Sequence, residues 1–180
     1  MTRKRIVALL TLLLFAVLVV AFEKLVPRNV ASRPLAYAKE SLGLEASLPQ
    51  TTRELLLDDR APMTVYAIHD FAQENMIPEE LRERPRLLGY PILTSREITD
   101  PAERRRITDS VRSAIGPDFD VDCVFVPHHA LSIRASGKSA TLLLCFRCGE
   151  LILEDSSGGS ANRRIDSTPQ PVLDAALRRR

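Results

Sequence analysis

The longest apolar run of the chain covers residues 6–22 (IVALLTLLLFAVLVVAF) and contains no charged residue. A helix needs about 17–25 consecutive apolar residues to cross a bilayer, so this run predicts a transmembrane segment of minimal length. Three cations lie within residues 1–5 and Glu23 follows the run, which predicts residues 1–5 in the cytoplasm and the rest of the chain outside it. The alternative is a signal sequence cleaved after small residues such as Val19 and Ala21, which would leave a secreted protein.

Prolines punctuate the segment that follows. Pro27, Pro34 and Pro49 lie within residues 23–50, a pattern typical of a stalk or linker. The remaining residues are numerous enough to bury a core of their own. We therefore expect four parts: a basic cytoplasmic end (1–5), a transmembrane anchor or signal sequence (6–22), a stalk (23–50) and an extracytoplasmic domain (51–180).

Short apolar and β-branched runs recur through the expected domain. Residues 63–68 (MTVYAI) and 90–98 (YPILTSREI) predict two strands, separated by a polar loop with a helical turn. Four further short runs predict strands at 121–126, 130–135, 140–146 and 150–155. Serine and glycine dominate residues 156–163, which predicts a flexible loop.

The clearest helical signal covers residues 100–117 (DPAERRRITDSVRSAIGP). Asp100 is expected to cap the helix, Pro101 suits its first position, and Glu103 would complete a capping box. Its apolar stripe consists of Ile107, Val111, Ala114 and Ile115. Gly116 and Pro117 are expected to end it.

A second helix is expected over residues 167–180, with Ser167 or Thr168 as its cap and Pro169 in its first turn. Residues 51–59 (TTRELLLDD) fit either a helix with Thr52 as its cap or a strand. Grouped strands with two flanking helices predict an α+β fold, with a mostly antiparallel sheet of about five or six strands.

Charge is distributed so that the domain itself is mildly acidic. The whole chain has a formal net charge of +2, but three cations precede the apolar run and residues 178–180 are all arginine. Without these six cations, 19 basic residues face 23 acidic ones. A nucleic-acid-binding domain concentrates basic residues on its folded part, so we expect no nucleic-acid partner.

One stretch, residues 123–149 (CVFVPHHALSIRASGKSATLLLCFRCG), holds all three cysteines and two of the three histidines. A hairpin centred on Gly137 would place His129 opposite Cys145, on the same face as Leu131 and Leu143. Cys148 would return beside Cys145 through a tight turn. The cysteines and an imidazole would then meet at one end of the hairpin.

Three interpretations of this stretch remain open. The first is a zinc site with Cys123, Cys145, Cys148 and either His128 or His129 as ligands, because a CxxCG turn between strands is typical of a zinc knuckle. The second is a disulfide between Cys145 and Cys148 with Cys123 unpaired, because thiols oxidise outside the cytoplasm. The third is a set of buried cysteines and hydrogen-bonded histidines without a ligand.

The same stretch resembles a pattern of uncharacterised exported proteins from planctomycete-type and related bacteria. Those proteins combine a C-F-x-P-R-H-G-I segment, a G-K-T turn, an I-C-F-E-C segment and an S-P-Q-P helix. The matching residues here are Cys123, Pro127, His129, Gly137, Lys138, Cys145, Phe146, Cys148, Pro169, Gln170 and Pro171. His128 and Ala130 stand where the pattern has arginine and glycine. The resemblance spans about residues 63–177 and implies export, but no particular activity.

We therefore expect a single-pass membrane protein whose extracytoplasmic domain has a structural or interaction role. A clip of cysteine and histidine side chains, closed by zinc or a disulfide, would hold the end of its sheet. The alternative function is a metal- or thiol-dependent enzyme that uses Cys123, His129, Cys145 and Cys148. The membrane is the only partner the sequence indicates, through the N-terminal segment.

Overall fold

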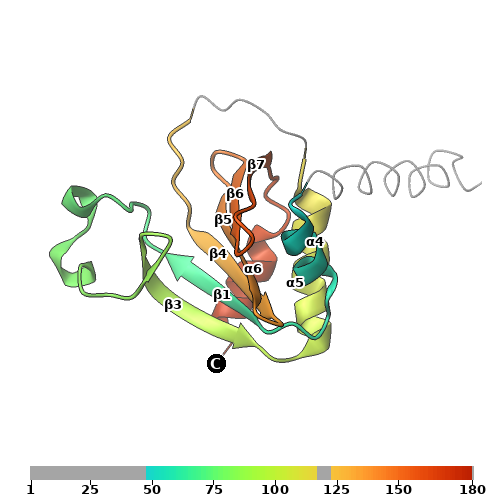
Figure 1. Ribbon diagram of the computed structural model, residues 1–180. Coiled ribbons are helices and arrows are strands. Elements are labelled where there is room, and N and C mark those ends of the chain that lie inside the picture. The colour runs from blue at the N-terminus through green and yellow to red at the C-terminus, as the bar shows by residue number, and fades with distance from the viewer. Residues whose placement is uncertain (1–47, 117–122, 180) are drawn as a thin grey trace, which may run out of the picture. The chain divides into compact units, whose positions relative to one another are not determined.

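An antiparallel sheet of seven strands organises residues 48–116 and 123–179, the parts of the chain that this computed structural model describes (Figure 1). The strands are β1 (Met63–Ile68), β2 (Arg86–Leu87), β3 (Tyr90–Ile98), β4 (His129–Ala135), β5 (Lys138–Cys145), β6 (Glu150–Asp155) and β7 (Ser160–Arg164). They lie in the order β2-β3-β1-β4-β5-β6-β7. The expected α+β class is confirmed, with more strands than the five or six predicted.

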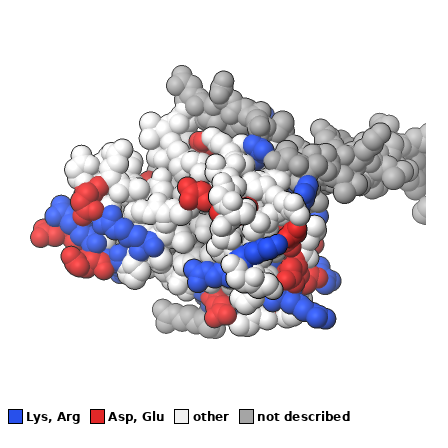
Figure 2. Space-filling view, in the orientation of Figure 1, with Lys and Arg blue, Asp and Glu red and all other residues white. Residues whose placement is uncertain are grey.

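β1 and β3 have the bounds that their hydrophobic patterns predict, and they pair with each other. The polar connection between them forms two single turns of 3-10 helix, η1 (Glu74–Met76) and η2 (Glu79–Leu81), before the short strand β2. Acidic and basic side chains both occur along this connection, and Figure 2 shows them side by side at the left of the view. The predicted loop with a helical turn is confirmed.

A two-residue turn joins β4 and β5 and sets the register of the sheet. Ser136 and Gly137 both have positive φ, 52° and 76°, as a type I′ hairpin turn requires. Ala135 therefore pairs with Lys138, and the same register pairs His129 with Leu144. The predicted pairing of His129 with Cys145 is wrong by one residue. Because side chains alternate along a strand, that single residue places the two on opposite faces.

The predictions for residues 156–163 and for residues 121–126 are also corrected. Residues 156–163 were expected to be a loop, but only residues 156–159 turn, and β7 follows them. The Asp155 carboxylate organises this turn by accepting hydrogen bonds from the backbone of Ser157 and Gly159 and from the Thr52 hydroxyl. The segment 121–126 was expected to be a strand, but its described residues, from 123 on, are irregular.

Among the described residues, three α-helices cover one face of the sheet, one more than the two predicted: α4 (Gln50–Leu57), α5 (Pro101–Ala114) and α6 (Gln170–Arg178). The additional helix, α4, shows that the segment 51–59 is mainly helical and not a strand, and it begins before the expected cap at Thr52. The core between helices and sheet includes Leu55, Leu56, Met63, Val65, Ile107, Val111, Leu131, Ile133, Leu142, Leu144, Leu151, Leu153 and Leu173. Burial of these side chains is the main force that holds the layers together.

The expected start of α5 is confirmed, but its capping box is not formed. The Asp100 carboxylate accepts a hydrogen bond from the Ala102 amide at 3.1 Å. Glu103 instead accepts two hydrogen bonds from the Arg96 guanidinium of β3, at 2.9 and 2.7 Å. Arg96 also donates to the Ala176 carbonyl of α6 at 3.0 Å, so a single arginine joins one strand to two helices.

The C-terminal helix α6 begins at Gln170, behind Pro169, and no side chain caps it. The predicted cap at Ser167 or Thr168 is wrong, because Ser167 contributes only its carbonyl, which accepts from the Gln170 amide at 3.1 Å. Pro169 was expected in the first turn, but it lies directly before it, at the N-cap position, and the proline within the first turn is Pro171.

The other face of the sheet carries a second, smaller apolar cluster. Ile68, Ala130 and Leu143 are buried in it, and Tyr66, Leu87, Tyr90, Ile92, Phe125 and Ile152 pack around them partly exposed. This face has no helix over it among the described residues.

The predicted membrane segment 6–22 and nearly all of the predicted stalk lie outside the described residues. Within residues 48–116 and 123–179, every helix is too short or too polar to cross a membrane.

Candidate functional site

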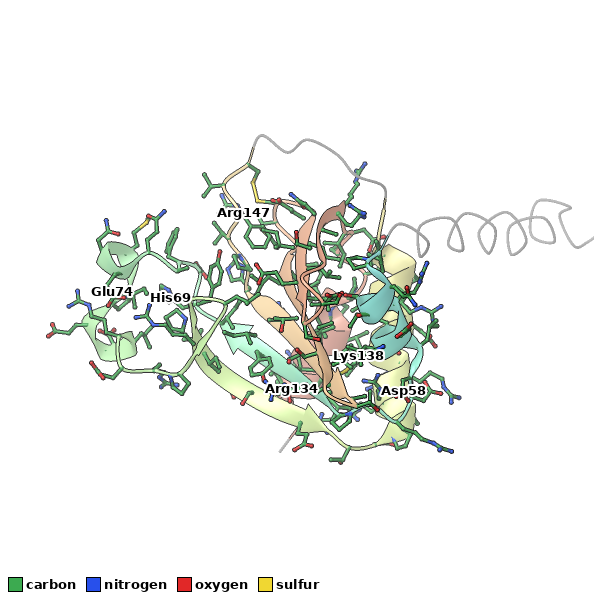
Figure 3. All side chains as sticks on the ribbon, viewed as in Figure 1. Asp58, His69, Glu74, Arg134, Lys138 and Arg147 are labelled. Atoms are coloured by element: carbon green, nitrogen blue, oxygen red, sulfur yellow. A yellow bond between two sulfur atoms is a disulfide. The ribbon has the colours of Figure 1, made fainter. Side chains whose placement is uncertain are left out.

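A disulfide joins Cys123 to Cys148 at one end of the sheet. The two Cα atoms are 6.0 Å apart, and 25 residues separate the cysteines along the chain. Cys148 lies in the turn between β5 and β6, whose last residue, Gly149, has a φ of +67°. Figure 3 shows the bond in yellow near Arg147, which lies in the same turn.

The disulfide fastens an irregular segment, residues 123–128, which we call the strap. Phe125 of the strap packs into the second apolar cluster, while Val124 beside it is 75% exposed. Backbone hydrogen bonds hold the other end, where the His128 amide donates to the Leu144 carbonyl at 3.3 Å and its carbonyl accepts from Ile68 at 3.1 Å. The strap is thus pinned at both ends, covalently at Cys123 and by the sheet at His128.

Cys145, the third cysteine, is a fully buried free thiol at the end of β5, three residues before Cys148. Its Sγ accepts a hydrogen bond from the Cys148 amide at 3.3 Å. Strand alternation places its side chain on the face of the second cluster, together with Glu150, its cross-strand partner. Burial, with the nearby Cys145 and Glu150, raises the pKa of Tyr90, which marks these three side chains as neighbours.

His129 faces the opposite side of the sheet, toward the helices. Its Nε2 lies 2.8 Å from Oδ1 of Asp174 in α6, and its ring contacts Phe146 with the centroids 5.6 Å apart. The side chain is only 8% exposed, and Nδ1 is buried without a hydrogen-bond partner. Burial lowers the pKa of His129, although the Asp174 carboxylate acts in the other direction. The ring therefore ties β4 to α6 through its contact with Asp174.

His128 is exposed to solvent. Its Nε2 lies 3.2 Å from Oδ1 of Asp70, and both side chains are substantially exposed. Adjacent side chains of an extended chain point in opposite directions, which explains why His128 and His129 lie in different surroundings.

The five residues predicted to meet at the sheet end are therefore divided into three places. Cys123, Cys148 and Cys145 come together, His129 lies on the other face, and His128 is exposed. The predicted Cys145–Cys148 disulfide is wrong, because Cys148 is bonded to Cys123.

These residues do not form the predicted Cys3His zinc ligand set as they are placed here. Two of the thiolates that zinc would need are bonded to each other, and the nearest buried imidazole belongs to the helix side of the sheet. No group of three or more His, Cys, Asp and Glu side chains within the described ranges is positioned to hold a metal ion.

Sequence reasoning missed Asp174 as the partner of His129. The available signal was its position directly after Leu173, on the side of α6 that the apolar stripe turns toward the sheet. A carboxylate in that place needs a polar partner on the facing strand.

Comparison of the chain with family models, with curated proteins and with solved structures found no match. The functional argument therefore rests on the geometry of the strap, the disulfide and the buried thiol.

Proposed function

We propose that the chain is a single-pass membrane protein of the cell envelope. Its N-terminus lies inside the cell, and its α+β domain lies outside the cytoplasm and has a structural or interaction role. The apolar run 6–22, with cations before it and Glu23 after it, supports this orientation.

The Cys123–Cys148 disulfide is the observation that carries this proposal. Disulfides form and persist in oxidising compartments and are rare in the cytosol, so the bond fits a domain outside the cytoplasm. It closes a 25-residue separation and fixes the strap, with the exposed Val124, to the end of the sheet. In this proposal the bond serves as the clip, although the predicted disulfide joined Cys145 to Cys148 instead.

Mixed charge on the domain agrees with a protein or envelope surface as its environment rather than nucleic acid. On the face drawn in Figure 2, lysine and arginine side chains lie among acidic ones instead of forming a continuous basic area. A nucleic-acid-binding face would gather its cations along one element.

The proposal is tested by expressing the full chain in an exporting bacterial host and in parallel a variant lacking residues 1–22. The full chain should remain in membranes after alkaline extraction and should lack two hydrogen atoms by intact mass, with one thiol free to alkylate after denaturation. The shortened variant should stay in the cytosol with three alkylatable thiols. A full chain recovered from the cytosol with all three thiols reduced would refute the proposal.

A further inference from the structure

Three sulfur atoms lie at one end of the sheet, yet only two of them are bonded. Cys145 is fully buried, and its sulfur accepts the Cys148 amide at 3.3 Å. The Cys148 sulfur is three covalent bonds from that amide nitrogen, so the free thiol and the bonded sulfur of Cys148 lie at the same tight turn.

We propose that Cys145 is the attacking thiol of an internal thiol–disulfide exchange at the clip of the proposed function. The Cys145 thiolate attacks Sγ of Cys148, the Cys145–Cys148 bond forms, and the Cys123–Cys148 bond breaks. The electron pair of the broken bond leaves with Cys123, whose sulfur takes up one proton, equal in number to the proton Cys145 gave up. No external oxidant or reductant is consumed.

The exchange exposes a thiol where the resting state has none. Cys145 is buried, whereas Cys123 is exposed and lies next to Val124, the most exposed large apolar residue of the described chain. Once Cys123 is released, that end of the strap keeps only its noncovalent contacts, such as Phe125 in the second cluster. The clip thereby becomes an exposed, reactive thiol on a loosened strap, the form that pairs with a cysteine of another exported protein.

Trypsin separates all three cysteines, so the position of the bond can be read directly. Cleavage after lysine and arginine gives peptides 113–134, 139–147 and 148–163, which carry Cys123, Cys145 and Cys148. The full chain, purified in mild detergent without reductant, is incubated at pH 8 with a maleimide that traps any exposed thiol. Samples are then acidified, digested and analysed by mass spectrometry.

We expect the label to accumulate on peptide 113–134 while peptide 139–147 becomes linked to 148–163. The Cys145→Ala variant, which keeps the resting disulfide, should lose this labelling. A label that appears first on peptide 139–147, or no label until the chain is denatured, would overturn the proposal. Labelling of Cys123 that persists in Cys145→Ala would overturn it as well.

A second variant tests the same bond without relying on the rate of exchange. Cys123→Ala, treated with oxidised glutathione, should form the Cys145–Cys148 disulfide, and two separate glutathione adducts would count against the proposal. Failure of the proposed function would give a different result from failure of the exchange. If the Cys123–Cys148 disulfide does not form, peptides 113–134 and 148–163 will be unlinked in the untreated wild-type chain.

Discussion

Removal of the clip should cost the domain a definite amount of stability. The clean perturbation is the double variant Cys123→Ala/Cys148→Ala, because it leaves Cys145 without a partner for any other disulfide. A cross-link stabilises mainly by lowering the entropy of the unfolded chain, by an amount that grows with the logarithm of loop length. For a sequence separation of 25 residues, the loop-closure relation gives about 3.5 kcal/mol at 25 °C.

Urea unfolding of the full chain in non-ionic detergent, followed by circular dichroism, measures this loss. With a urea dependence of about 1.5–2 kcal/mol per molar, the midpoint should fall by about 2 M. A phosphine reductant should move the wild type to the midpoint of the double variant and leave that variant unchanged. Cys145→Ala is the matched control, since it keeps the clip and should still respond to the reductant. A wild type whose midpoint is insensitive to reduction would refute the loop-closure reasoning.

Three further predictions concern the packing around the sheet. Because burial lowers the pKa of His129, the unfolded chain binds the proton of this histidine more tightly than the folded chain does. The free energy of unfolding should therefore fall as the pH drops below about 6.5, by at most about 1.4 kcal/mol per pH unit. In urea titrations at several pH values, His129→Gln should reduce this pH dependence, and an unchanged pH dependence would assign it to other groups. Arg96→Ala leaves the buried Glu103 carboxylate without its two hydrogen bonds from Arg96. Thermal unfolding should then show that the free energy of unfolding falls by about 2–3 kcal/mol, and Arg96→Lys should recover part of this loss. Equal stability of the wild type and both variants would contradict this role of Arg96. Gly159→Ala would place a Cβ atom 2.7 Å from Cβ of Pro49. This steric overlap should lower the urea midpoint by the equivalent of about 1–3 kcal/mol. An unaltered midpoint would mean that the β6–β7 turn is free to move away from α4.

Local patterns in the sequence predict local structure well in this domain. The strands 63–68 and 90–98 and the start of the helix at Pro101 have the predicted bounds, because each depends on neighbouring residues: alternating apolar positions for the strands, and the Asp100 cap for the helix. The same holds for the polar connection between the strands.

The site depended on information that local patterns do not contain. A type I′ turn with Ser136 in the left-handed region shifts the β4–β5 register by one residue, and the pair His129–Cys145 is lost with it. The choice between Cys123 and Cys145 as partner of Cys148 depends on how the strap crosses the sheet end, which is a tertiary contact. Residues 160–163 were wrongly predicted as part of a loop because their pairing with β6 outweighs a weak local strand preference.

The position of β5 inside the sheet protects its aggregation-prone apolar run from pairing with other molecules. The apolar run Leu142–Leu143–Leu144 lies in this strand, paired on both sides by β4 and β6. As far as the described residues extend, one edge of the sheet is the two-residue strand β2 and the other is β7, a short polar strand that ends in Arg163 and Arg164. A second copy that approached the β7 edge would bring the same positive charges, so strand addition from molecule to molecule is disfavoured and fibril growth finds no template there.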